Sequence, residues 1–368
     1  MPEPERLRSL DVFRGFTLLA MVLVNSHPGK PYPPLAHAAW NGWTFTDLIF
    51  PFFIFIAGVA IPYSFANRVG RGLSRRSLFW RIVRRSVLLF GIGLFLNGFP
   101  KFDLSTWRIM GILQRIAICY FLASVIFVIL RLKPKSIAWL SGTILALYFV
   151  LLKFIPVPGY GAGVLEPVGN WGNFIDQHLL AGHMQHGSWE GKSLLGNLPA
   201  LVTMLMGLLT GLYLREDRPA FEKLTHLYFF GSLAMAAGAC WSLWFPINQG
   251  LWTSSLVLFM GGMAILFLAT CYFLVDLKKM RRGTLPFLVF GLNSIAVWVF
   301  SQLGMKILMA IPAAAPDGTP SNLWAAGGDY LARYLGPLNG SLAFAIVYDL
   351  FWLGVMYAFY RRRIFIKL

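Results

Sequence analysis

Apolar stretches of about 20 residues recur along the whole chain, and every second connection between them is strongly basic. A helix of roughly 20 apolar residues spans the hydrocarbon core of a bilayer. Each stretch is too long for a strand of a membrane barrel. We therefore predict an all-α polytopic membrane protein of about 10–11 transmembrane helices in a single domain, residues 1–368. The ten predicted spans are residues 11–28, 44–66, 82–99, 109–130, 136–155, 193–214, 225–245, 254–275, 285–303 and 341–360.

The basic residues are distributed asymmetrically between the connections. The net charge is +17, and 24 of the 32 Lys and Arg residues lie at the termini or after the second, fourth, sixth and eighth spans. Basic connections stay on the cytoplasmic side of a membrane. We therefore expect both termini in the cytoplasm, a lipid bilayer as the surroundings of the spans, and no nucleic-acid partner. The connections 29–43, 156–192 and 304–340 are then extracytoplasmic.

Several polar residues fall at one predicted depth, near the outer surface. Asn25 ends the first span, Asp47 begins the second, and Gln114 and Arg115 lie early in the fourth, while His37 lies in the connection 29–43. Polar residues inside a membrane are costly and are therefore default functional candidates. Their common depth predicts a site there.

Structural alternatives remain open for three of these residues. For His37 the alternative is a histidine that only lies at the membrane interface. Thr44 and Asp47 have the spacing of a capping box, in which Asp47 only closes the start of its helix. In a further alternative, Arg115 is a structural residue that only neutralises the charge of Asp47. Three loop histidines lack cysteines or paired acidic residues nearby, so we predict no metal site at His178, His183 and His186.

The first span has a second pattern. Arg14 and Asn25 are eleven residues apart, which places them on one helix face about 16 Å from each other. A cationic inner end and a hydrogen-bonding outer end suit a long ligand such as coenzyme A, with phosphates at one end and a thioester at the other. Arg85, among the basic residues that begin the third span, is a further candidate for the phosphates. A basic anchor at the inner leaflet is the alternative for both arginines.

Six segments of the sequence form a recognisable pattern. They are Arg8-Ser-Leu-Asp-Val-Phe-Arg-Gly15, the block from His37 to Pro51, Gly111-Ile-Leu-Gln-Arg115, Pro156-Val-Pro-Gly159, Gly291-Leu-Asn-Ser294 and the ending from Arg362 to Leu368. Together they resemble a known family, heparan-α-glucosaminide N-acetyltransferase and its bacterial relatives, and the similarity runs in order along essentially the whole chain.

The resemblance implies a membrane enzyme that moves acetyl from cytoplasmic acetyl-CoA to the amine of a glucosamine on the other side. His37 matches the family's active-site histidine, and Asn25 matches an asparagine just upstream. The family also implies a homodimer, and its bacterial branch implies the inner membrane. This chain has one more residue between the two matched positions, a proline-rich stretch there, and no long N-terminal luminal region. We therefore expect a bacterial amino sugar or cell-wall fragment as acceptor.

The chemistry of the residues fits this reading. Neutral His37 is suited to take the proton that the attacking amine loses, or to act as the nucleophile and form an acetyl-imidazole. Asn25 is the candidate donor to the developing oxyanion, and Asp47 orients His37 or holds the sugar. The predicted acetyl-CoA ligands are Arg14, Arg85, Gln114 and Arg115. The alternative functions are an amino-sugar transporter and a scaffold without chemistry.

The predicted orientation is testable by thiol labelling in intact cells. In a background in which Cys119, Cys240 and Cys271 are replaced by serine, Ser188→Cys should react with an impermeant thiol reagent and Ser74→Cys should not. The reverse labelling pattern would contradict the orientation and place His37 on the cytoplasmic side.

Overall fold

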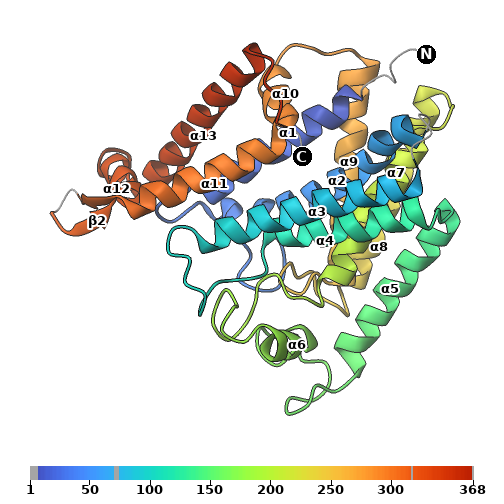
Figure 1. Ribbon diagram of the computed structural model, residues 1–368, viewed down its shortest axis with the longest axis horizontal. Helices are drawn as coiled ribbons and strands as arrows, with labels where there is room; N and C mark the ends of the chain where they lie inside the picture. The colour runs from blue at the N-terminus through green and yellow to red at the C-terminus, as the bar shows by residue number, and fades with distance from the viewer. Residues whose placement is uncertain (1–6, 70–73, 316–317, 367–368) are drawn as a thin grey trace.

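The computed structural model describes residues 7–69, 74–315 and 318–366, which are mainly helical (Figure 1). Arg6, Arg71 and Lys367, counted above among the basic residues, lie outside these ranges. The α-helices are α1 (Arg8–Asn25), α2 (Phe45–Val69), α3 (Arg75–Gly98), α4 (Ile112–Ser124), α5 (Pro134–Phe154), α6 (Trp171–Leu179), α7 (Asn197–Leu214), α8 (Ala220–Trp241), α9 (Ser254–Cys271), α10 (Leu285–Leu292), α11 (Ser294–Ala310), α12 (Leu323–Leu335) and α13 (Pro337–Arg361). The short turns are the 3₁₀ helix η1 (Pro33–Leu35) and the π-helical η2 (Val125–Ile129) and η3 (Tyr272–Leu277).

The predicted all-α membrane fold is confirmed, and each of the ten predicted spans coincides with a helix or a helix pair. Six helices are long and apolar enough to cross a membrane, or seven if α10 and α11, bent by 85° relative to each other, form one span. In the described residues, α1, α3 and α8 fall short of the apolar character required of a membrane-spanning helix. Helix α1, for example, buries Asp11 against its neighbours, and a helix that turns polar groups to the interior of the bundle needs fewer apolar residues.

The predicted extracytoplasmic connections contain more regular structure than the sequence indicated. Helix α6 lies inside 156–192. Helix α11 continues to Ala310, and the rest of 304–340 holds α12 and a small antiparallel hairpin of β1 (Pro312–Ala314) and β2 (Pro320–Asn322). In Figure 1, α6 lies near the lower edge of the view, and the start of α1 lies near the upper edge.

Helices α1 and α10 cross with their backbones in contact. A Cβ atom added at Gly15 would lie 1.6 Å from the carbonyl oxygen of Phe287, and one added at Gly291 would lie 2.1 Å from that of Asp11. Any side chain at either glycine would force the helices apart. Both glycines belong to segments that carry the family resemblance, so the packing gives these motifs a structural reason.

Helices α2 and α7 use the same device. Added Cβ atoms at Gly58 and Gly207 would lie 2.0 Å from the carbonyl oxygens of Met204 and Phe55, respectively. Small residues at crossings are typical of membrane helices, because lipid tails give no hydrophobic force that pushes helices together and close van der Waals contact must supply it. The two crossings fix α2 against α7 and α1 against α10.

The crossing of α1 and α10 yields a stability prediction. Gly15→Ala should lower the free energy of unfolding by about 1–3 kcal/mol or prevent folding, because the added methyl group overpacks a backbone contact. Gly354→Ala is the control, since its added Cβ meets no atom within 4 Å and alanine favours the helix. Heating the detergent-solubilised protein and measuring the fraction that stays monodisperse tests the pair. Equal melting temperatures of the two variants would contradict the prediction.

Candidate active site

A buried carboxylate holds the loop that carries His37. Asp47 lies in the first turn of α2 and is 2% exposed. Its Oδ1 lies 2.6 Å from Nδ1 of His37, and its Oδ2 accepts hydrogen bonds from the backbone amides of Ala38 (2.9 Å) and Thr44 (3.0 Å). The contact with Thr44 is the capping-box contact. Asp47 therefore closes its helix and orients the imidazole at the same time.

The His37 ring faces open space. Its side chain is 59% exposed, whereas that of its partner Asp47 is 3% exposed. A carboxylate that accepts the Nδ1 proton leaves the lone pair on Nε2, and Nε2 is then the nitrogen able to accept a proton or attack an acyl carbon. The pair has the orientation that general-base or nucleophilic chemistry requires.

Trp40 ties the His37 loop to two other connections. Its Nε1 donates to the carbonyl oxygen of Leu165 (2.8 Å), and its ring meets that of Trp189 edge to face at 5.5 Å. Its own carbonyl oxygen accepts from Nδ2 of Asn248 (3.0 Å). The connections 29–43, 156–192 and the one between α8 and α9 thus form one layer, which is the outer layer in the predicted orientation.

Asn25 lies at the end of α1 and is exposed. Its Nδ2 donates to the carbonyl oxygen of Met21 at 2.7 Å. No hydrogen bond joins Asn25 to His37 in the part of the chain that the structure describes. An amide has two N–H donors, so one of them remains for a ligand.

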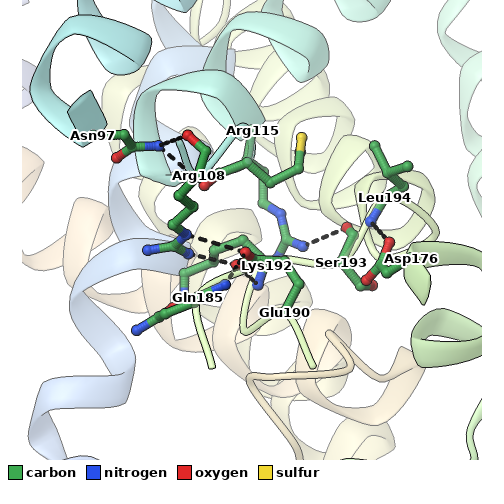
Figure 2. Close-up of polar contacts among 10 residues, drawn as sticks. Asn97, Arg108, Arg115, Asp176, Gln185, Glu190, Lys192, Ser193 and Leu194 are labelled. Atoms are coloured by element: carbon green, nitrogen blue, oxygen red, sulfur yellow. Dashed lines mark hydrogen bonds and ion pairs between the residues drawn. The ribbon is translucent and has the colours of Figure 1, made fainter. Parts of the chain in front are cut away.

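Arg115 is fully buried, and Figure 2 shows its guanidinium directed toward Ser193, in the segment that precedes α7. Its Nη2 donates to the carbonyl oxygen of Ser193 (2.9 Å), and its guanidinium lies 5.0 Å from the ring centre of Trp252. Within the described ranges Nε and Nη1 have no hydrogen-bond partner, and no ion pair joins Arg115 to Asp47. The structural alternative of an Asp47–Arg115 pair is therefore wrong.

Glu190 fastens the connection 156–192 to the segment between α3 and α4. Its carboxylate receives two N–H groups of Arg108, as Figure 2 shows, one of them at 3.1 Å. It also accepts the backbone amides of Gln185 (3.0 Å) and Lys192 (2.9 Å). With four N–H donors, the hydrogen-bonding capacity of the Glu190 carboxylate is filled. Glu190 thereby fixes the connection 156–192 to the segment between α3 and α4.

Lys192 lies near Asp47 and was not selected by the sequence reasoning. Its Nζ lies 5.5 Å from the ring centre of Phe50, one turn along α2 from Asp47. Burial, together with the nearby charges of Arg115 and Arg108, lowers the pKa of Lys192 to about 7 against the smaller opposing effects of Glu190 and Asp47. A lone lysine just before an apolar span, in a connection that is otherwise not basic, was the only available signal.

A cavity of about 300 Å³ contains both Arg14 and Arg85. The Arg14 guanidinium donates to Asp11 (3.2 Å) and to the carbonyl oxygen of Gly291 (3.5 Å). Arg85 lies 4.7 Å above the ring of Tyr120, and its buried Nε has no hydrogen-bond partner among the residues that the structure describes. The volume is at the lower end of the range for small-molecule sites.

Distant segments that carry the family resemblance meet at this cavity. Asn293, at the bend between α10 and α11, donates through Nδ2 to the carbonyl oxygen of Ile364 (3.1 Å) and accepts the amide of Ile366 (2.9 Å). Ile366 and Gly291 both line the cavity. Asn293 therefore holds the C-terminal segment as one wall of it.

The two other residues that were predicted to bind acetyl-CoA, Gln114 and Arg115, do not line the cavity. On α4 the lining residues are Leu113, Ile116 and Tyr120, which share one helix face. Arg115 projects from the opposite face. Gln114 packs against α3, where its Oε1 would lie 2.5 Å from a Cβ added at Gly93. The structure thus brings Arg14 and Arg85 together and separates Gln114 and Arg115 from them.

Comparison with known proteins shows the family to which this chain belongs. The family model described as the catalytic part of heparan-alpha-glucosaminide N-acetyltransferase matches residues 6–245. The enzyme of that name from Mus musculus is 32% identical over 349 residues, which cover 80% of this chain and 53% of the mouse protein. The Homo sapiens enzyme is 32% identical over 355 residues, covering 80% and 52%. The chain therefore spans about half the length of these relatives. It belongs to the heparan-α-glucosaminide N-acetyltransferase family.

Proposed function

We propose that this protein is a transmembrane N-acetyltransferase. It takes acetyl from cytoplasmic acetyl-CoA and transfers it to the amine of a glucosamine-type sugar on the extracytoplasmic side. The observation that carries the proposal is the exposed His37 ring held through Nδ1 by the buried carboxylate of Asp47. The names of the relatives support acetyl transfer rather than the transporter alternative.

The transfer needs one proton acceptor at the outer surface. As the sugar nitrogen attacks the thioester carbon, the new C–N bond forms, the C–S bond breaks, and the amine loses a proton. Nε2 of His37 takes that proton and delivers it to the departing sulfur of coenzyme A. Asp47 stabilises the imidazolium that exists between the two steps, since it accepts the Nδ1 proton in a buried environment.

A second route uses the same nitrogen as a nucleophile. In this route Nε2 attacks the thioester, coenzyme A leaves as the thiol, and the acetyl-imidazole then passes its acetyl group to the amine. The geometry of His37 and Asp47 serves both routes equally. Asn25, with its remaining N–H, is the proposed donor to the carbonyl oxygen in either case.

In this proposal, acetyl-CoA lies along α2 between the Arg14–Arg85 cavity and His37. Arg14 and Arg85 bind its phosphates in the 300 Å³ cavity, because arginine binds phosphate through charge-assisted, paired hydrogen bonds. The outermost α2 residue of the cavity, Phe53, is six positions from Asp47, which is about 9 Å along a helix. An extended coenzyme A bridges that distance with its pantetheine arm. The proposal also places the protein in the bacterial inner membrane as a homodimer.

His37→Ala should abolish acetyl transfer while leaving acetyl-CoA binding intact, because the ring supplies the proton transfer and not the phosphate contacts. The measurement is turnover of purified protein with acetyl-CoA and a panel of amino sugars, beside calorimetric binding of acetyl-CoA. The matched control is His178→Ala, an exposed histidine in the last turn of α6 whose Nδ1 lies 2.7 Å from the carbonyl oxygen of Phe174. Near-parental turnover of His37→Ala would contradict both routes. Acetyl label retained on His37 without acceptor would select the second.

Arg85→Gln should raise the KM for acetyl-CoA about tenfold or more and leave the KM of the sugar nearly unchanged. The loss of a charged hydrogen bond to phosphate costs about 1.5–3 kcal/mol of binding free energy. Arg84→Gln is the control, since it removes the same charge from an exposed neighbouring position that does not line the cavity. Equal KM values for the two variants would place the phosphate site elsewhere.

A further inference from the structure

A second, larger cavity lies among basic residues of the connections that we predict to be cytoplasmic. It measures about 820 Å³ and shares no lining residue with the Arg14–Arg85 cavity. Its walls come from the start of α1, the end of α2, the α7–α8 connection and the segment that follows η3. The fold therefore collects residues that are more than 200 positions apart in the sequence, such as Arg8 and Lys279, around one space.

The lining of this cavity is strongly cationic. In the part of the chain that the structure describes, its charged members are five bases and one acid: Arg8, Arg215, Lys223, Lys279, Arg281 and Asp276. The single carboxylate already accepts the backbone amide of Ser9 at 3.2 Å. Two of the bases are positioned by backbone carbonyl groups, since Arg215 donates to Pro62 (3.3 Å) and Lys223 to Leu214 (2.9 Å). Five like charges with one counter-charge repel one another, and an anion in the cavity removes that repulsion.

The backbone at Lys279 is strained where it meets the cavity. Its φ is +52°, in the left-handed region that non-glycine residues seldom occupy. Arg131 adopts the same conformation (φ +55°), and like Lys279 it comes two residues after a π-helical end, η2 or η3. Arg131 lines an adjacent cavity of about 410 Å³ together with Arg215. Of the five non-glycine residues with positive φ in the described ranges, Lys279 and Arg131 are cations on a cavity wall. Strain of this kind gathers at ligand-binding positions.

We propose that the 820 Å³ cavity binds a phosphate-bearing anion separate from the acetyl-CoA proposed for the Arg14–Arg85 cavity. Two sources supply this chemistry on the predicted cytoplasmic side: the headgroup of an anionic phospholipid and soluble phosphate. Basic pockets between membrane helices bind anionic headgroups in this way. Leu7 and Leu277 beside the cations give a lipid an apolar contact that free phosphate does not use.

The test measures the melting temperature of the full-length protein in neutral detergent at constant ionic strength. Phosphatidylglycerol, phosphatidylcholine and inorganic phosphate are added separately. Phosphatidylglycerol or phosphate should raise the melting temperature by several degrees, and phosphatidylcholine should not. A rise with phosphatidylglycerol alone assigns the site to a lipid, and a rise with phosphate as well assigns it to soluble phosphate. No rise with either anion would overturn the proposal.

Paired variants connect that response to the cavity. The double variant Lys279→Gln, Arg281→Gln should lose at least half of the rise. Lys278→Gln, Arg282→Gln, which removes the same charge from the same segment outside the lining, should keep it. Equal losses in the two double variants would overturn the proposal, because bulk charge then explains the response. Arg281→Gln alone replaces the first variant if that protein does not fold. Calorimetry with acetyl-CoA is a separate readout: its failure in the parent would contradict the proposed function and leave this test unaffected.

Discussion

Backbone contact at glycine determines where the functional groups of this protein lie. Gly15 and Gly291 let α1 and α10 touch, and this contact brings the Arg14 guanidinium against the Gly291 carbonyl at one wall of the 300 Å³ cavity. Gly58 and Gly207 do the same for α2 and α7. Because a helix is stiff, a crossing fixed at mid-length also fixes the position of its ends. The depth and rotation of Asp47 at the start of α2 therefore depend on glycines several turns away.

Local pairing made the contact between His37 and Asp47 predictable. His37 and Asp47 are ten residues apart on either side of one helix start, and the capping spacing already fixed the direction of the Asp47 carboxylate. The spans were predictable as well, because the length of an apolar stretch decides whether a helix can cross a bilayer. Both inferences depend only on neighbours in the sequence.

The rotation of a helix about its axis was not predictable in this way. Arg115 was expected to bind the donor or to neutralise Asp47, but neighbouring helices turn it toward Ser193 and Trp252. When a helix is apolar on nearly all sides, the sequence does not indicate which side meets which partner. Lys192 was missed for a related reason. Its low pKa comes from burial and from Arg108 and Arg115, which lie far from it in sequence.

Contacts between residues that lie far apart in the chain were equally unpredictable from the sequence. Arg108 and Glu190 are 82 residues apart, and each looked like an ordinary charge in an outer connection. The contact of Asn293 with the C-terminal segment is likewise formed only in the folded chain, although both partners belong to segments that carry the family resemblance. A motif can mark such a residue without revealing what it touches.

The hydrogen bond between His37 and Asp47 makes the two ring nitrogens chemically unequal. Nδ1 is occupied by a carboxylate that is itself fixed by two backbone amides, and Nε2 makes no hydrogen bond within the described residues. An electrophilic analogue of the acyl donor therefore meets a single site on the ring, and its adduct has a defined regiochemistry. The position of the modified nitrogen then serves as a chemical record of whether the carboxylate was in place when the bond formed.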